Sequence, residues 1–244
     1  MEFVAKSDVG IKRKNNEDSY FAKKYNNDIS LYIVADGLGG YEGGEIASKL
    51  LVIKMARCFE EHLKDNLKSE EVVRNVLQNS LFECNRQIHA MESSNEKYSG
   101  MGTTIVLVAI IYGEIYYLSV GDSRLYYIDE NATYIKQITE DDTYVNELLR
   151  KNVIKLEEAK NHPQKHVLTK AIGVFNDLNI EVNKLYKDKG YLLLCTDGLT
   201  NMVEDNKILE IVNKTKFEKL ADKYIEVANS RGGADNTTVV VVKL

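Results

Sequence analysis

Two aspartates stand directly after short apolar runs, and each is followed by a glycine. Asp36-Gly37 follows the run 31–35, and Asp197-Gly198 follows the run 191–196. A carboxylate at the end of a buried strand is held on a rigid element at the edge of the core. The glycine lets the backbone bend sharply and bring its own carbonyl close to a ligand. Both positions are therefore candidates for metal binding.

Two more acidic positions precede apolar runs. Asp235 stands before the run 237–242, and Asp18 stands before the run 19–23. If these carboxylates converge they repel one another, and bound cations offset that repulsion. All the candidate ligands are oxygens, with no Cys or His beside them in the sequence. The pattern therefore favours Mg²⁺ or Mn²⁺ over zinc or copper.

One arginine accompanies this acidic set. Arg13 lies in the same polar segment as Asp18, and a planar guanidinium binds two phosphate oxygens at once. Each feature has an ordinary explanation by itself, because Asp-Gly pairs are common in turns and most arginines lie on the surface. Only the combination favours a metal site with a phosphate-binding group beside it.

The composition is that of one globular domain, residues 1–244, with 44% hydrophobic and 28% charged residues. A formal net charge of -5 argues against nucleic acid or an anionic membrane as the main partner. The three cysteines have no paired spacing, which excludes a disulfide framework and a zinc pattern. No secretory signal is present at the start, and the most apolar stretch, 103–120, is interrupted at Gly113-Glu114. We expect a cytoplasmic monomer.

Strands and helices come in separate groups along the chain. Helical spacing predicts consecutive helices over 45–63 and 70–91, with Ser69 as an N-cap. Two more are predicted over 206–213 and 217–229. Strands are predicted over 3–5, 19–23, 31–35, 103–111, 115–120, 125–128, 134–138, 180–185, 191–195 and 237–242. Because no strand separates the first two helices, we expect an α+β domain of mainly antiparallel sheets packed face to face, with helices outside. The polar segment 139–163 is predicted to form an inserted flap.

Eight motifs occur in a fixed order over nearly the whole chain. They are RKNNED (13–18), VADGLGG (34–40, continuing through Gly44-Glu45 and Ala47-Ser48), MGTT (101–104), GDSRLY (121–126), TEDDTYV (139–145), TKAIG (169–173), CTDGL (195–199) and GGADNTT (232–238). Together they resemble the metal-dependent protein phosphatases, the PPM or protein phosphatase 2C-like family, in its compact bacterial form. The resemblance implies a four-layer αββα sandwich with a small flap.

The resemblance also implies roles for individual residues. Asp36 would bridge two Mn²⁺ or Mg²⁺ ions, with Asp197 and Asp235 completing the ligands of one ion. The Gly37 carbonyl would serve the other ion, and Asp18 would act beside them, directly or through water. A third, weaker ion would be held by Asp122 together with Asp197, and Arg13 would take the substrate phosphate.

The implied reaction is hydrolysis of phosphoserine and phosphothreonine in proteins. A metal-bridged water or hydroxide attacks phosphorus in line with the leaving oxygen, and no phosphoenzyme forms. A bacterial serine/threonine kinase would be the opposing enzyme. Relatives carry a histidine at one of two positions held here by Leu38 and Tyr41, so a metal-bound water is the candidate for protonating the leaving group. Lys170 replaces a usual arginine, and Asp142 replaces a common histidine.

Three other functions compete with this interpretation. The loop 37–43 loosely imitates a dinucleotide-binding glycine loop, but Glu42 takes the place of its third glycine and a second helix stands where an acidic strand is required. A phosphatase-like module that only binds or signals is the stronger rival, and loss of Asp36, Asp197 or Asp235 would favour it. All three are present. A phosphatase dedicated to one regulatory partner is the third possibility.

Overall fold

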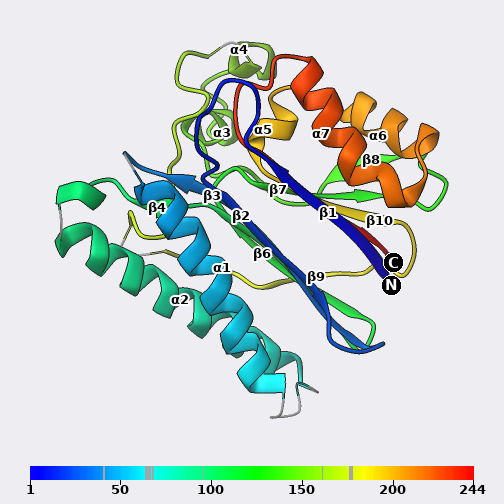
Figure 1. The fold of residues 1–244 in the computed structure, drawn as a ribbon, viewed down its shortest axis with the longest axis horizontal. Coiled ribbons are helices and arrows are strands. Elements are labelled where there is room, and N and C mark those ends of the chain that lie inside the picture. The colour runs from blue at the N-terminus through cyan, green and yellow to red at the C-terminus, as the bar shows by residue number, and fades with distance from the viewer. Residues whose placement is uncertain (41, 64–66, 68, 95, 161, 176–177) are drawn as a thin grey trace.

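Two antiparallel sheets pack face to face, and helices cover the outer face of each (Figure 1). The computed structural model describes residues 1–40, 42–63, 67, 69–94, 96–160, 162–175 and 178–244. The first sheet has the order β1 (Glu2–Asp8), β11 (Thr237–Lys243), β10 (Tyr191–Cys195), β7 (Arg124–Ile128) and β8 (Ile135–Gln137). The second has the order β2 (Asp18–Lys24), β3 (Ile29–Leu38), β5 (Ile105–Ile111), β6 (Glu114–Val120) and β9 (Asn183–Leu185), and β4 (Gly102–Thr103) pairs with β3.

Alternation along the strands divides the core into three layers. In β3, Leu31 and Ile33 face helices α1 (Gly43–His62) and α2 (Glu70–Ser94), whereas Tyr32 and Val34 pack between the sheets. The first sheet in turn packs against α6 (Asp205–Lys214) and α7 (Leu220–Ser230). The short elements are η2 (Glu96–Tyr98), α3 (Tyr144–Arg150), α4 (Leu156–Lys160), α5 (Asp197–Thr200) and η3 (Phe217–Lys219). The predicted αββα sandwich is confirmed.

Most differences from the predicted elements are local. The strand predicted over 180–185 pairs only as β9, because only its last three residues reach the edge of β6. The run 103–111 is divided into β4 and β5 at Thr104, whose backbone amide donates to the Asp36 carbonyl (2.8 Å). Helix α5 was not predicted. Every strand pairing among the described residues is antiparallel, which excludes the parallel sheet of a dinucleotide-binding fold.

The apolar stretch around residue 110 forms a hairpin, as predicted. Ile111 pairs with Glu114, so Tyr112 and Gly113 make a two-residue turn in which both have positive φ, 51° and 83°. Within the described ranges no helix combines the length and the apolar character needed to cross a membrane.

The flap leaves and rejoins the body of the molecule at one place. Thr143 and Leu168 form an isolated antiparallel bridge, and the Thr169 amide donates to the Asp142 carbonyl (2.8 Å). Helices α3 and α4 lie between these ends, inside the predicted range 139–163. The returning limb continues to Leu168, five residues past Pro163, because it pairs with the departing limb there.

The first prediction concerns Gly37, where β3 passes the start of α1. A Cβ atom at Gly37 would overlap the Gly44 carbonyl oxygen, whereas a Cβ at Gly40 would meet open space. We expect Gly37→Ala to lower the free energy of unfolding by about 1–3 kcal/mol, as overpacking does. Gly40→Ala should change it by less than about 0.5 kcal/mol. Urea denaturation followed by circular dichroism measures both, and equal effects would contradict the close approach.

Candidate active site

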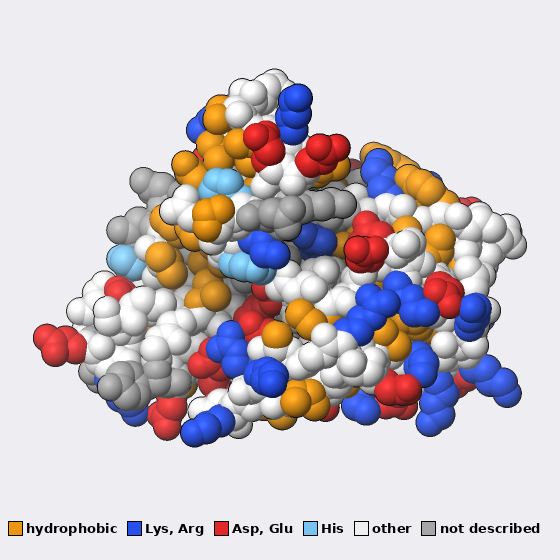
Figure 2. Space-filling model, turned by 90° about the horizontal axis from the view of Figure 1, so that it is seen from above, with side chains coloured by type: hydrophobic (Ala, Val, Ile, Leu, Met, Phe, Trp, Pro, Cys, Tyr) orange, Lys and Arg blue, Asp and Glu red, His pale blue; other side chains and the backbone are white. Residues whose placement is uncertain are grey.

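A hollow of about 480 Å³ opens at the end of the molecule where the flap meets the two sheets. In the view from above, acidic side chains are visible within a recess that basic and histidine side chains surround (Figure 2). The polar side chains that line this hollow are Arg13, Glu17, Asp36, Asp122, Lys165, His166, Asp197, Asn201, Asp235 and Asn236. Four of the five predicted acidic residues therefore share one cavity.

The fifth, Asp18, lies behind the hollow on the strand next to Asp36, and the two residues are direct partners in the β2–β3 register. One carboxylate oxygen of Asp18, Oδ2, accepts hydrogen bonds from Thr196 (2.9 Å) and Thr238 (2.7 Å). The other oxygen, Oδ1, is buried without a hydrogen-bond partner. Burial raises the pKa of Asp18 to about 7, despite the two threonine hydrogen bonds.

Asp36 occupies the most charge-crowded position. Its burial raises the pKa of the carboxyl well above the ordinary value, and the nearby charges of Asp18 and Asp197 raise it further. The backbone of Asp36 makes two hydrogen bonds with Thr104. The Asp36 amide donates to the Thr104 hydroxyl (2.9 Å), and the Thr104 amide donates to the Asp36 carbonyl (2.8 Å). The same hydroxyl is hydrogen-bonded to Ser123 (2.7 Å), so Thr104 connects Asp36 to the turn that carries Asp122.

Asp197 comes from the other sheet, and Asp122 comes from the turn that joins the two sheets. Asp197 begins α5 directly after β10, and its Oδ2 accepts from Asn201 Nδ2 (2.9 Å). Burial and the charge of Asp235 raise the pKa of Asp197, while the Asn201 hydrogen bond lowers it. Asp122 lies between β6 and β7, and burial, followed by the charge of Asp197, raises its pKa to about 7. The carboxyl groups thus interact across both sheets.

Arg13 stands at the rim of the hollow and is paired with Asp235. The distance from Arg13 Nη2 to Asp235 Oδ2 is 2.8 Å, and about half of the arginine side chain remains exposed. Asn236 fixes the loop around them, because its Nδ2 donates to the carbonyls of Val9 and Asn15 (both 2.9 Å). The predicted arginine therefore lies beside the acidic cluster, with part of its guanidinium accessible.

This donor set suits hard divalent cations. All the candidate groups are oxygens, and the unpartnered Asp18 Oδ1 and the raised carboxyl pKa values indicate negative charge that the protein alone does not compensate. Within the described ranges, no three His, Cys, Asp or Glu side chains are already grouped as a chelating set. The carboxylates are near enough to shift one another's pKa.

Sequence reasoning missed two basic groups of the hollow, Lys165 and His166. Both belong to the returning limb of the flap, past its predicted end, and nothing in their local sequence signals that the chain turns back over the acidic cluster. Leu38 lines the hollow without a titratable group. Tyr41 lies outside the described residues. Asp142 and Lys170 do not line the hollow and form an ion pair (2.7 Å) elsewhere.

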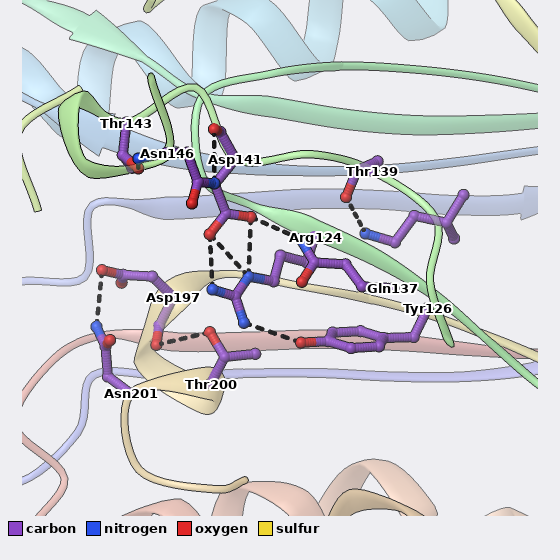
Figure 3. Close-up of polar contacts among 11 residues, drawn as sticks. Arg124, Tyr126, Gln137, Thr139, Asp141, Thr143, Asn146, Asp197, Thr200 and Asn201 are labelled. Atoms are coloured by element: carbon purple, nitrogen blue, oxygen red, sulfur yellow. Dashed lines mark hydrogen bonds and ion pairs between the residues drawn. The ribbon is translucent and has the colours of Figure 1, made fainter. Parts of the chain in front are cut away.

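The start of the flap is fixed to the first sheet by a half-buried arginine. Arg124 on β7 donates to both oxygens of Asp141 (2.6–3.0 Å) and to the Tyr126 hydroxyl (2.9 Å) (Figure 3). Gln137 donates to the same carboxylate (2.7 Å), and Asn146 in α3 donates to the Asp141 carbonyl (3.0 Å). This network lies beside Asp197 and Asn201 and forms one wall of a second cavity that adjoins the hollow.

Comparison with known proteins agrees with this geometry. The family model described as protein phosphatase 2C matches residues 11–238. The protein phosphatase PhpP of Streptococcus pneumoniae is 37% identical, covering 100% of this chain and 98% of that protein. The serine/threonine phosphatase stp of Listeria monocytogenes is 35% identical over 98% of this chain and 94% of its own length.

Solved structures give the same result at the level of the backbone. The serine/threonine phosphatase of S. agalactiae superposes with a TM-score of 0.91 at 33% identity, covering 100% of this chain and 99% of that one. The phosphatase PstP/Ppp of Mycobacterium tuberculosis gives 0.87 at 32% identity, with 100% and 98% covered. With a family model that spans almost the whole sequence and relatives that match end to end, the chain belongs to the protein phosphatase 2C family.

Proposed function

We propose that the hollow hydrolyses phosphoserine and phosphothreonine in other proteins, with two Mn²⁺ or Mg²⁺ ions held by its carboxylates. One observation carries the proposal: five aspartates from distant parts of the chain converge, with an arginine at the rim, in a member of a protein phosphatase family. The enzyme is therefore a metal-dependent serine/threonine protein phosphatase, and phosphorylated proteins are its substrates.

The resemblance to the family assigns the residues that would hold the ions, and the hollow brings most of them together. Asp36, the Gly37 carbonyl, Asp197 and Asp235 would hold the two ions, and Asp18 would act through its unpartnered Oδ1, directly or through water. Asp122, which interacts with Asp197, would help to hold a third and weaker ion.

The chemistry needs no covalent intermediate on the protein. Bound ions of this kind lower the pKa of water into the neutral range and stabilise charge on phosphoryl oxygens. The described residues that line the hollow include no Ser, Thr or Cys, so that lining offers no hydroxyl or thiol nucleophile. Its own residues hold the carboxylates in place and orient the phosphate.

Arg13 is the residue that we assign to the phosphate. Its pairing with Asp235 positions the guanidinium at the rim, where about half of the side chain is exposed and can bind phosphate oxygens. The alternative of a non-catalytic binding module is less favoured, because the residues proposed as ligands are all present. We further propose a serine/threonine kinase of the same cell as a partner, and failure to dephosphorylate such a kinase would count against it.

Removing a central carboxylate should abolish turnover. We expect Asp36→Asn and Asp197→Asn each to lower kcat by roughly a thousandfold or more, because the bound ions supply the nucleophile. Asp222→Asn is the matched control, because Asp222 is an exposed carboxylate that pairs with Lys6 and does not line the hollow. Hydrolysis of a phosphothreonine peptide is measured with manganese and with a chelator. Unchanged rates in the two variants, or activity in chelator, would remove the proposed function.

Arg13 should affect substrate binding more than turnover. We expect Arg13→Ala to raise KM by about tenfold with a smaller change in kcat, because a charge-assisted contact to phosphate is lost. Arg13→Lys keeps the charge but lacks the planar guanidinium, so its KM should lie between the values for the wild type and for Arg13→Ala. Steady-state kinetics with the same peptide separates the two constants. A fall in kcat at constant KM would show instead that Arg13 acts only in the transition state.

Without metal, the folded protein should lose stability as the pH rises. Asp18 and Asp122 have pKa values of about 7 in the fold against an ordinary 3.8, so between these values the folded state binds more protons than the unfolded state. The free energy of unfolding in chelator should therefore fall from about pH 4 to pH 7. Denaturation curves across this range measure the slope.

Asp122→Asn removes one of these titrating groups and should flatten that slope. Manganese should stabilise the wild type more at high pH than at low pH, because it binds the ionised carboxylates. An identical slope for Asp122→Asn and the wild type would contradict the shifted pKa of Asp122.

A further inference from the structure

The buried carboxylate of Asp142 links the two limbs of the flap at its root, where both limbs meet the body of the molecule. Its backbone amide donates to the Gly121 carbonyl (2.9 Å), and its Oδ2 accepts from the Gly121 amide (3.2 Å). Its Oδ1 lies 2.7 Å from Lys170 Nζ, which follows the returning limb of the flap. One side chain thus contacts the body of the molecule and both ends of the flap.

The hydrogen bonds between Asp142 and Gly121 connect the flap to the turn that carries Asp122. Gly121 directly precedes Asp122 and has a φ of 98°, and a Cβ atom there would overlap the Thr104 side chain at 2.6 Å. The turn therefore has little freedom to move on its own. The two Gly121 hydrogen bonds therefore anchor Asp142 to a rigid part of the body.

The ion pair between Asp142 and Lys170 connects the flap to the segment that contacts Asp36. Two residues beyond Lys170, Ile172 exchanges backbone hydrogen bonds with Thr103 (both 2.9 Å). The Thr103 hydroxyl donates to the Asp36 carbonyl (2.9 Å). The Asp142–Lys170 pair therefore links the turn that carries Asp122 to the segment that contacts Asp36, two of the proposed metal ligands.

The pair lies outside the catalytic hollow. Both residues face a separate groove of about 320 Å³ at the root of the flap, together with Glu140 and Arg150. Arg150 also makes an ion pair there, with Glu140, but at 3.8 Å and with both side chains largely exposed. Asp142 and Lys170 can therefore act on catalysis only by positioning other groups.

We propose that the Asp142–Lys170 ion pair is a latch that holds the returning limb of the flap, and with it Lys165 and His166, over the catalytic carboxylates. This inference rests on the proposed function, since it assigns the latch a role in binding the protein substrate. A phosphopeptide is long enough to contact the flap, whereas a small aryl phosphate occupies only the hollow. Loss of the latch should therefore impair peptide turnover selectively.

Lys170→Met tests the latch, because it keeps the length of the side chain and removes the charge. We expect kcat/KM for a phosphothreonine peptide to fall roughly tenfold, since small misplacements of positioning groups are costly. Turnover of p-nitrophenyl phosphate should change by less than about twofold, within the range of a surface substitution. Lys170→Arg should retain peptide activity, and Arg150→Met, the matched control, should leave both substrates unaffected. Equal losses for the two substrates, or equal effects of Lys170→Met and Arg150→Met, would overturn the proposal.

A double variant tests whether the two residues act as a pair. In an Asp142→Asn background, Lys170→Met should cause no further loss of peptide activity, because the interaction is already absent. Additive losses would refute the latch. If Asp142→Asn does not fold, the comparison of peptide turnover in Lys170→Met and Arg150→Met still tests the latch.

Hydrogen exchange separates the latch from the proposed function. Amides of the flap, residues 143–168, should exchange faster in Lys170→Met than in Arg150→Met, whether or not the protein hydrolyses phosphate. Unchanged exchange would overturn the latch alone. Absence of manganese-dependent hydrolysis in the wild type, with faster exchange in Lys170→Met, would overturn the function and leave the latch as a structural element.

Discussion

Mutual repulsion among buried carboxylates is the constraint around which this end of the molecule is built. Asp18, Asp36, Asp122 and Asp197 all have pKa values raised by burial and by the charges of neighbouring carboxylates. Such a cluster is unfavourable unless cations or protons neutralise it. The fold tolerates it because each aspartate is attached to an element that packing already holds in place.

The two sheets provide that attachment in complementary ways. The second sheet places Asp18 and Asp36 side by side on β2 and β3, and the first places Asp197 and Asp235 at the ends of β10 and β11. Buried hydroxyls connect the sheets, since Thr196 and Thr238 both donate to Asp18. These hydrogen bonds favour the ionised carboxylate and partly offset its burial. The interface between the sheets is apolar along most of its length, and the charged groups lie at its catalytic end.

The flap is a different kind of element from the rigid sandwich. It rests on polar contacts at its root, chiefly the Arg124–Asp141 pair on the departing limb and the Asp142–Lys170 pair between the limbs. Because polar pairs are weaker than a packed core, the flap can adjust while the carboxylates stay fixed. Substrate choice can thus vary through the flap without disturbing the metal ligands. Asp142 and Lys170 fit this division, since they lie outside the hollow.

The sequence by itself determined the strands, the long helices, the layered architecture and the candidate ligands, because these depend on local periodicity and on short motifs. The apolar run 31–35 and the two Asp-Gly pairs that follow apolar runs were recognisable without coordinates, although β3 continues past its predicted end at residue 35 to Leu38. Only the tertiary structure decided which groups meet. The pairing of Asp18 with Asp36, the partners of Thr104, and the approach of Lys165 and His166 all join segments far apart in the chain. The short helix α5 and the true end of the flap likewise arise from contacts with distant residues, and no local pattern encodes such contacts.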